Sequence, residues 1–501
     1  MQDRQKDYKA RQQGFKRIKQ LRVTPLYKEL PAKDRTPLEI YEKLKKGKHS
    51  FLLESINGTP KTARYSFIGT DPFIIFKSKG NEIELTYEGK RSLAGKDPLL
   101  KLRELMGNFK IERIKNLPPF FGGAVGFFSY DLVHVFEKLP SKAKKDINLP
   151  DINLILTDTV IAFDHFKNTI TVIIIPAIRH LGFGYNTLTS GLLRDCKQDA
   201  EKKMGEIVNL INSPAIADQT ASVKEEKIKP VSNLTKEGYM SIVKKCKEYI
   251  AAGDIYQANL SQRLSARIGS VKPVELYRRL REINPSPFSA LIEFDDIALV
   301  SSSPERLIKL EGSDVETRPI AGTRPRGKTE NEDNEMRGEL IANEKERAEH
   351  IMLIDLERND IGRVCEYGSV NVDEFMNIED YSHVIHIVSN IKGRLKKDKD
   401  GFDLIKAAFP GGTITGVPKI RCMEIIDELE PVARGPYTGS IGYISFAGDI
   451  DLNIIIRTFV IKNGQAYVQA GAGIVADSDP EREYYETLHK AEALLKVLEG
   501  I

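Results

Sequence analysis

Two segments that lie far apart in the chain each carry a pair of glutamates three positions apart. The segment 343–360 contains no glycine or proline, is rich in good helix-forming residues, and includes Glu346 and Glu349. Residues three apart on a helix project from the same side. A second segment near the C-terminus repeats the arrangement with Glu483 and Glu486. The sequence therefore predicts two helices that each present a pair of carboxylates.

The chemistry of these four carboxylates depends on whether the two helices face each other. If they do, the like charges repel unless a cation lies between them. A hard divalent cation is the natural occupant, because the ligands are oxygens and no cysteine-rich set accompanies them. The alternative is two solvated helix faces, with Glu486 simply paired with Lys490. Spacing alone leaves both interpretations open.

The C-terminal helix has a predicted start and a predicted buried face. Pro480 suits the first helical turn, behind Ser478 or Asp479 as the capping residue. An apolar stripe lies well away from the two glutamates of this helix. It consists of Tyr484, Leu488, Ala491, Leu495 and Leu498.

The composition excludes several classes of protein. The 501 residues suggest two lobes or one large fold, with 41% hydrophobic residues for a core. A net charge of +4, from 75 basic and 71 acidic residues, gives no strong general attraction to nucleic acid. The longest apolar run, 170–178, is too short to span a bilayer, so no membrane association is expected. Residues 1–22 are a basic extension without the apolar core of a secretory signal.

Composition and patterning divide the rest of the chain. Residues 23–212 contain helix signals and a turn-rich alternation typical of a β-meander, and 213–233 are expected to be a linker because they lack periodicity. Residues 234–501 form the second region, in which 322–335 is predicted to be a polar loop and 451–461 a single strand. Strands and helices mix without a βαβ rhythm, which indicates an α+β fold of layered sheets under outer helices.

One short pattern occurs in both regions. GGAVGFFSYD at 122–131 and TGSIGYISFAGD at 438–449 share a G-x-[VI]-G-[FY] core. The match suggests related strand units in the two regions.

Several motifs of the second region are difficult to explain by packing alone. PIAGTRPRG at 319–327 is a Gly-Thr-Arg turn after a strand, and PGGTITGVPK at 410–419 places backbone N–H groups where a helix begins, which suits an anion. Arg457 lies in the apolar stretch LNIIIRTFVI, where an arginine is expected to bind an anion. His383 and His386 have an odd spacing, so at most one of them points to a given pocket.

Taken together, these motifs resemble those of the chorismate-utilising enzymes, and most closely anthranilate synthase component I. In the second region the resemblance rests on SSSPERL, PIAGTRPRG, AEHIMLIDLERNDIGRV, the histidine of VIHIVS, PGGTITGVPK, RGPYTGSIGY, IRT and AGAGIV. In the first region it rests on TPLEIYEKL, SFLLES and RYSFIG. The resemblance implies a layered sandwich of two large mixed or antiparallel sheets flanked by helices. Residues 23–212 would form an effector-binding lobe and 234–501 a chorismate-binding catalytic domain.

The resemblance also implies a metal site and a substrate site. Glu349 and Glu486 would hold Mg²⁺, with Glu346 and Glu483 beside them, partly through water. This division suits a cation that retains several waters. Chorismate is a dicarboxylate, which an arginine fork and backbone donors can bind. The matching substrate-binding positions are Gly322, Thr323, Tyr437, Arg457, Gly471, Ala472 and Gly473.

Three further residues match catalytic positions of the family. Glu305 is the candidate general acid for the leaving 4-hydroxyl group, and it needs a raised pKa to hold its proton. His386 and Thr413 match positions linked to proton transfer and to orientation of the amino-intermediate. In the implied reaction, ammonia adds at C2 of chorismate as the 4-hydroxyl leaves, and pyruvate is then eliminated to give anthranilate.

The resemblance implies partners and regulation as well. Ammonia would come from glutamine on a separate amidotransferase subunit, component II, in a hetero-oligomer. None of the cysteines lies in a G-x-C-x-G elbow, and their wide spacing without a CxxC pair is typical of a reducing, cytoplasmic setting. Tryptophan is the expected inhibitor, although NPSPFSA departs from the tyrosine-methionine more frequent after the second proline, which bears on its affinity. The matching effector positions are Glu54, Ser55, Asn284, Pro285, Pro287, Phe288 and Ser289.

Three alternative functions remain. Aminodeoxychorismate synthase adds ammonia at C4, and the PGG turn, SIGYISF and DLNIIIRT favour this function. Two residues favour anthranilate synthase instead: Ala321 stands where many aminodeoxychorismate synthases have a catalytic lysine, and Thr413 stands where they often have serine. Gln257 stands where relatives that use water have a lysine base, which argues against isochorismate or salicylate synthesis. A non-catalytic tryptophan-binding regulator would be expected to lose a metal glutamate, His386 or Glu305, and all are present.

Overall fold

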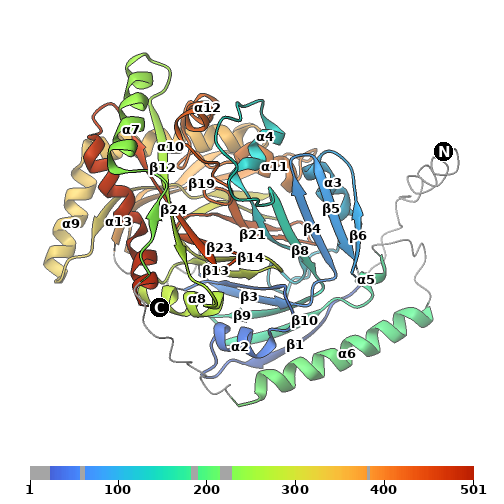
Figure 1. Ribbon diagram of the computed structural model, residues 1–501. Helices are drawn as coiled ribbons and strands as arrows, with labels where there is room; N and C mark the ends of the chain where they lie inside the picture. The colour runs from blue at the N-terminus through green and yellow to red at the C-terminus, as the bar shows by residue number, and fades with distance from the viewer. Residues whose placement is uncertain are drawn as a thin grey trace, which may run out of the picture.

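Two large antiparallel sheets form the centre of the molecule, as Figure 1 shows. The computed structural model describes residues 23–56, 63–87, 89–181, 190–214, 228–380 and 384–500. The basic extension 1–22, most of the expected linker and His383 lie outside these residues, so the predictions about them stay untested.

The first sheet has twelve strands among the described residues. Their order is β1 (Leu26–Pro31), β10 (Thr169–Ile174), β9 (Thr159–Asp164), β3 (Tyr65–Thr70), β2 (Ser50–Glu54), β13 (Phe288–Glu293), β14 (Ile297–Ser303), β23 (Thr458–Lys462), β24 (Gln465–Ile474), β12 (Gln257–Arg267) and β11 (Val231–Ser232), with β20 (Gly416–Val417) paired to β12.

The second sheet also has twelve strands in the described part of the chain. Their order is β17 (Ile320–Pro325), β19 (Val384–Arg394), β16 (Asp314–Thr317), β15 (Arg306–Glu311), β22 (Ile450–Ile454), β21 (Ser440–Ser445), β7 (Gly123–Phe128), β8 (Ile152–Thr157), β4 (Ile74–Lys79), β5 (Glu82–Tyr87) and β6 (Lys90–Leu93), with β18 (Asn371–Asp380) paired to β19.

Helices pack on the outer faces of the sheets. Against the first sheet lie α2 (Pro37–Leu44), α6 (Ser190–Asn212), α8 (Pro273–Ile283), α13 (Pro480–Glu499) and α7 (Lys236–Ala251). Against the second lie α9 (Glu330–Ala342), α10 (Glu344–Gly362) and α11 (Gly401–Ala408). Helix α12 (Lys419–Leu429) also packs on the first sheet, against β12 and β20. The remaining described helices are α3 (Pro98–Gly107), a 3₁₀ turn at Tyr130–Leu132, α4 (Val133–Phe136) and α5 (Ile178–Leu181). The predicted layered α+β sandwich is therefore confirmed.

The main hydrophobic core lies between the sheets and draws side chains from both. Phe67 of the first sheet packs edge-on against Tyr443 of the second, with ring centroids 5.5 Å apart. Phe120 stacks on the same tyrosine at 4.6 Å. Such aromatic pairs add to the burial of apolar area that stabilises the sandwich.

Each sheet combines a block of strands from the N-terminal half of the chain with a block from the C-terminal half, and the two blocks meet at one strand pair. In the first sheet β2 pairs with β13, so that Leu52 faces Leu291. In the second sheet β7 pairs with β21, so that Gly126 faces Gly442. These two glycines belong to the two copies of the repeated G-x-[VI]-G-[FY] pattern, which therefore form neighbouring strands. The predicted division at 213–233 stays a prediction, although α6 ends at the residue before it.

The chain crosses from one sheet to the other twice in ways that matter for function. β14 ends at Ser303 and β15 begins at Arg306, so Glu305 lies at a crossing. The predicted single strand 451–461 is wrong, because it is broken between β22 and β23, where the chain changes sheets. Arg457 lies in this break with a left-handed φ of 49°. Glu305 and Arg457, two predicted site residues, thus lie where the chain passes from one sheet to the other.

Two other details differ from expectation. The predicted polar loop 322–335 is wrong, because β17 runs to Pro325 and α9 begins at Glu330, capped by the Thr329 hydroxyl group. On α13 the fully buried face is offset from the predicted stripe, which contains only two of its members. The buried residues of this helix are Thr487, Ala491, Leu494, Val497 and Leu498.

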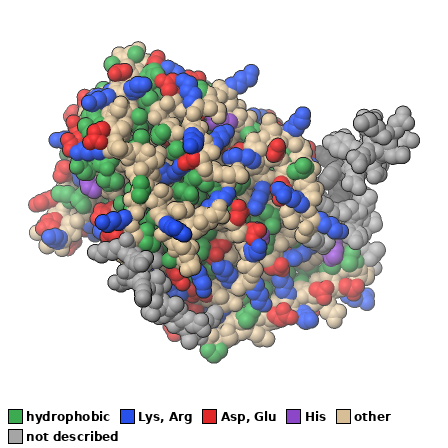
Figure 2. Space-filling view, in the orientation of Figure 1, with side chains coloured by type: hydrophobic (Ala, Val, Ile, Leu, Met, Phe, Trp, Pro, Cys, Tyr) green, Lys and Arg blue, Asp and Glu red, His purple; other side chains and the backbone are tan. Residues whose placement is uncertain are grey.

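The surface carries charges of both signs. Figure 2 shows Lys and Arg interspersed with Asp and Glu over the visible face, as the nearly balanced composition implies. None of the helices in the described ranges is long and apolar enough to cross a membrane.

Candidate active site

The two predicted glutamate pairs lie on α10 and α13, and local sequence explains where each helix starts. The Asn343 side chain caps α10 by accepting the N–H of Glu346 at 3.1 Å. Asp479 caps α13, with Pro480 in the first turn as expected. Each glutamate pair therefore sits near the N-terminal end of its helix.

The structure brings the four carboxylates together. Burial raises the pKa of Glu349, and the other three carboxylates of the set raise it further. Burial likewise raises the pKa of Glu483, with an added contribution from Glu486. Such mutual repulsion is what carboxylates show when they surround a place suited to a cation.

The donor set fits a hydrated magnesium ion. In the described chain no three acidic, His or Cys side chains approach closely enough to enclose a bare metal ion. However, Oε2 of Glu346 and Oε2 of Glu483 are both buried without a hydrogen-bond partner. Magnesium keeps several of its waters and takes only one or two carboxylates directly, so two buried carboxylate oxygens without a partner suit it. Arg324 already neutralises part of the negative charge of the four carboxylates, because its Nη1 lies 2.5 Å from Glu346 Oε1.

The Gly-Thr-Arg turn lies directly against α10. Gly322 has a φ of +66°, and a Cβ at this position would collide with Oε2 of Glu346. Glycine is therefore required both for the backbone conformation and for the close approach of the carboxylate. The turn forms a bulge in the pairing of β17 with β19, which sets Thr323 opposite His386.

His386 is buried and is held by the same turn. Its Nδ1 lies 3.0 Å from the carbonyl oxygen of Gly322 and 3.1 Å from Thr323 Oγ1. Burial and the positive charge of Arg457 lower the pKa of His386 to about 4. The imidazole is therefore neutral at pH 7, with Nδ1–H donated to Gly322 and Nε2 as the basic nitrogen.

Glu305 has the properties that a general acid needs. It is buried, and burial raises its pKa to about 7, although Thr413 beside it lowers the pKa in part. Oε1 of Glu305 and Oγ1 of Thr413 are both buried without a hydrogen-bond partner. The carboxyl group is therefore partly protonated near neutral pH and has an oxygen available for a substrate.

The predicted amide donors lie toward the C-terminal end of β24, in a long strand pairing. In β24, Gly471 and Gly473 face Ser261 and Asn259 of β12. A Cβ on Gly471 would collide with Asn259 Oδ1 and approach the Tyr437 hydroxyl oxygen within 2.9 Å. Tyr437 is buried, and burial raises its pKa. The buried Ala472 lies between the two glycines.

Two cations lie near Glu305 and His386. Arg457 lowers the pKa of both Glu305 and His386, so its charge lies close to both. Lys490 does the same, and its Nζ donates to the carbonyl oxygen of Gly471 at 3.2 Å. The structure thus gathers Glu305, His386, Thr413, Tyr437 and Arg457 around one region. The Gly322–Thr323 turn and residues 471–473 belong to the same region.

Sequence reasoning missed the second role of Lys490. It considered this residue only as a partner of Glu486, and that ion pair is present at 2.7 Å. The additional contact with Gly471 makes Lys490 a further candidate for binding a substrate carboxylate. The available signal was its position one turn after Glu486 on the helix face that carries the glutamates.

The predicted effector residues from distant segments also meet. Glu54 is cross-strand partner to Ser289, and its buried carboxylate accepts hydrogen bonds from Tyr277 at 2.7 Å and Arg281 at 3.0 Å. Ser55 donates to the carbonyl oxygen of Tyr65 at 3.0 Å. Residues 284–288 connect α8 to β13, and there the Arg306 guanidinium group lies 5.0 Å from the Phe288 ring centroid. Pro285 and Pro287 belong to this connection.

Comparisons with known proteins identify the family of the chain. Over 481 residues, 95% of this chain and of the relative, the chain is 46% identical to anthranilate synthase component 1 of Aquifex aeolicus. It is 42% identical over 477 residues to aminodeoxychorismate synthase component 1 of Bacillus subtilis, covering 95% of this chain and 97% of the relative. The structure matches that of anthranilate synthase component I from Streptococcus pneumoniae with a TM-score of 0.75 and 33% identity, covering 93% and 99% of the two chains. Residues 48–496 match the family described as chorismate binding enzyme. The chain belongs to the chorismate-binding enzyme family.

Proposed function

We propose that this protein is the large component of an anthranilate synthase, which aminates chorismate at C2 and then eliminates pyruvate. The observation that carries the proposal is the convergence of four glutamates in a chain that also holds a buried acid, Glu305, with a pKa of about 7. This combination supplies both a cation site for a carboxylate and a proton for a leaving hydroxyl group. Relatives named anthranilate synthase component 1 support the choice.

In this proposal the metal site is formed by Glu349 and Glu486, with Glu346 and Glu483 acting partly through water. Bound Mg²⁺ would neutralise the ring carboxylate of chorismate and favour departure of the 4-hydroxyl group. The second carboxylate would be bound by Arg457 and by the amide groups of residues 471–473. Lys490, which contacts Gly471, would contribute a further positive charge.

Proton transfers are assigned to two residues. Glu305 gives its proton to the 4-hydroxyl, which leaves as water while the nitrogen of ammonia bonds to C2. In the second stage the proton at C2 is removed and the C3–O bond breaks, so that pyruvate leaves and the ring becomes aromatic. The neutral His386, whose Nδ1 is held by Gly322, has a basic Nε2 for this step. Thr413 lies beside Glu305, where its hydroxyl group orients the amino-intermediate.

The remaining parts of the proposal concern partners, regulation and setting. Ammonia is supplied by a glutamine amidotransferase subunit, and the names of the relatives, which specify a first component, support this. Tryptophan inhibits by binding between Glu54, Ser55 and residues 284–289, which the fold places side by side. The setting is the cytoplasm, since all four cysteines are free thiols.

A second candidate function is aminodeoxychorismate synthesis, with ammonia added at C4. The 42% identity to aminodeoxychorismate synthase component 1 favours it, and the two reactions use the same substrate and metal chemistry. Ala321 leaves no lysine next to the Gly322 turn, which favours the first candidate.

Product identification decides between the two. The purified chain is incubated with chorismate, Mg²⁺ and ammonium at alkaline pH, and the product is analysed by fluorescence and chromatography. Fluorescent anthranilate supports the proposal. A non-aromatic 4-amino product, converted to p-aminobenzoate only by an added lyase, would show that the second candidate is correct. If chorismate is not consumed, both are wrong.

A further inference from the structure

A buried arginine, Arg434, uses every donor of its guanidinium group. Both it and its partner Glu430 are buried, with 4% and 3% of their surfaces exposed. Nε and Nη2 of Arg434 bind the two carboxylate oxygens of Glu430 at 2.9 and 2.7 Å. A guanidinium group has five N–H bonds, so three donors remain.

The three remaining donors reach three different segments of the candidate site. Nη1 donates to the carbonyl oxygen of Ile414 at 2.9 Å and to Thr438 Oγ1 at 3.2 Å. Nη2 donates to the carbonyl oxygen of Asn259 at 2.6 Å. Ile414 follows Thr413, and Thr438 follows Tyr437, so both contacts lie next to predicted site residues.

Glu430 extends the connection to the strand that carries the amide donors. Its Oε1 accepts the N–H and the hydroxyl group of Ser261, each at 2.8 Å. Ser261 faces Gly471, and Asn259 faces Gly473, in the pairing of β12 with β24. The Arg434 guanidinium group also lies 5.6 Å from the ring centroid of Tyr437.

We propose that Arg434, held by Glu430, is a positioning residue that fixes the Thr413 turn, Tyr437 and the 471–473 amides in one geometry for chorismate. The proposal rests on the proposed function, since it assigns a purpose to the same site. Lysine cannot replace this residue, because its ammonium group is a point charge with three donors and no planar fork. A buried pair of this kind also leaves an uncompensated charge if one member is lost, so the conservative change is the informative one.

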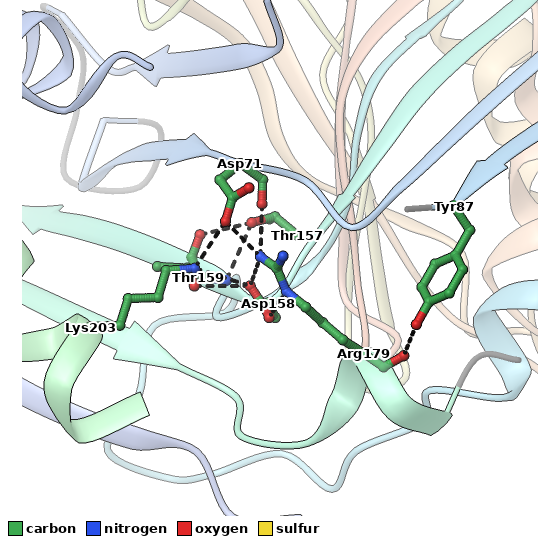
Figure 3. A network of polar contacts seen from close by, with 7 residues as sticks. All are labelled: Asp71, Tyr87, Thr157, Asp158, Thr159, Arg179 and Lys203. Carbon is green, nitrogen blue, oxygen red and sulfur yellow. Dashed lines mark hydrogen bonds and ion pairs between the residues drawn. The ribbon is translucent and has the colours of Figure 1, made fainter. Parts of the chain in front are cut away.

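Arg179 provides a matched control. Figure 3 shows it between Asp158 and Asp71, with Lys203 of α6 alongside. Arg179 Nε lies 2.6 Å from Asp158 Oδ2, and Nη2 lies 2.9 Å from Asp71 Oδ2. None of the seven residues drawn there belongs to the candidate site. The variant R179K therefore makes the same chemical change in an ion-pair network that joins other elements.

The test compares R434K with R179K in kinetics, binding and melting temperature. Rates are measured as chorismate consumption, so they are valid whichever amino product forms. We expect R434K to lower kcat/KM about 100-fold, with a raised KM as well as a lowered kcat, because small misplacement of several binding groups is that costly. Calorimetry should show a matching loss of chorismate affinity. R179K should stay within about twofold of the wild type in both parameters, since distant sites act independently.

The proposal is overturned if R434K and R179K lose activity to the same extent at the same loss of melting temperature. If R434K does not fold, S261A decides, because it removes a single hydroxyl group from the network. A rise of about fivefold in KM for chorismate, roughly 1 kcal/mol or the value of one such hydrogen bond, supports the proposal, and an unchanged KM overturns it. A wild-type chain that neither binds nor consumes chorismate would instead overturn the proposed function itself.

Discussion

Asn284 and Ser302 exchange two hydrogen bonds. Asn284 Nδ2 donates to Ser302 Oγ at 2.7 Å, and Ser302 Oγ donates back to the carbonyl oxygen of Asn284. Asn284 caps the C-terminus of α8, and Ser302 lies in β14 three positions before Glu305. The predicted effector segment is thus joined directly to the strand that delivers the predicted acid.

A second connection reaches the other sheet crossing. Asn453 Nδ2 donates to the carbonyl oxygen of Phe288 at 3.0 Å, and Asn453 lies in β22 four positions before Arg457. A ligand that displaces residues 284–288 would therefore act on the segments of both Glu305 and Arg457. If tryptophan binds there as proposed, these connections would let it inhibit without occupying the chorismate site.

Asn284→Ala should weaken inhibition more than catalysis. Losing the side-chain hydrogen bond to Ser302 releases one end of the segment that connects α8 to β13. We therefore expect the tryptophan concentration for half-inhibition to rise about tenfold, which corresponds to roughly 1.4 kcal/mol of coupling free energy. The turnover number should change less than about threefold. Inhibition curves at fixed chorismate measure both, with Asn371→Ala, an exposed position of β18, as the control. Equal losses of inhibition and turnover would contradict the coupling.

Glu349→Gln should abolish turnover while leaving the fold intact. The amide cannot replace a carboxylate at the metal, but it also removes one of four repelling charges. Added Mg²⁺ should raise the melting temperature of the wild type, by mass action on the folded state, and should do so less in the variant. Glu344→Gln, an exposed position on the same helix, should behave like the wild type. Near-normal turnover in Glu349→Gln would show that the metal assignment is wrong.

The pKa of Glu305, about 7, predicts a pH dependence. A general acid works in its protonated form, so kcat/KM for chorismate at constant free ammonia should fall about tenfold per unit above pH 7. Glu305→Gln should remove this decline and lower the rate at all pH values by about 10²-fold or more. A kcat/KM profile of the wild type that stays flat from pH 6 to 9 would exclude this role.

The same group has a predictable effect on stability. Because the folded pKa is raised above the unfolded value of 4.5, the folded state binds more protons between pH 4.5 and 7. The free energy of unfolding should therefore fall as pH rises through this window. In Glu305→Gln that contribution to the decline disappears, which urea denaturation at pH 5 and pH 8 would measure.

Gly322→Ala should damage the metal site specifically. The added methyl group meets Oε2 of Glu346 and is placed on a backbone with a φ of +66°. We expect the Mg²⁺ concentration for half-maximal activity to rise about tenfold or more, a change typical of losing groups that orient metal ligands. Gly338→Ala, in α9 with open space around it, is the control. An unchanged Mg²⁺ requirement would show that the turn does not position Glu346.

The sequence predicts individual helices and strands better than the points where the chain passes from one to the next. The helix bearing Glu349 and the helix after Asp479 are found because caps and spacing are local signals. The apolar run around Arg457 hides a change of sheet, because residues buried on either sheet look alike in sequence. The error at 322–335 has a different cause, because α9, which begins at Glu330, buries only Asp333 and Leu340 and so has no apolar stripe that would mark a helix.

The predicted site residues were found through motifs, whereas the contacts that hold those residues in place were not. Glu346, Gly322 and His386 stand in short patterns that are separate in sequence, and only the structure shows that they contact one another. Arg434 begins the motif RGPYTGSIGY and Glu430 lies four positions before it, but neither fact shows that the pair is buried or which backbone acceptors it reaches. Such relationships depend on strand register, which a single sequence does not specify.

The joining of N-terminal and C-terminal strands within each sheet limits how the protein can be dissected. A cut between residues 214 and 228 would separate β2 from β13 and β7 from β21, leaving bare edges in the middle of each sheet. Unpaired edges invite aggregation, so the C-terminal fragment alone should precipitate rather than turn over substrate. Two fragments synthesised together could instead reassemble, as complementary pieces of one enzyme.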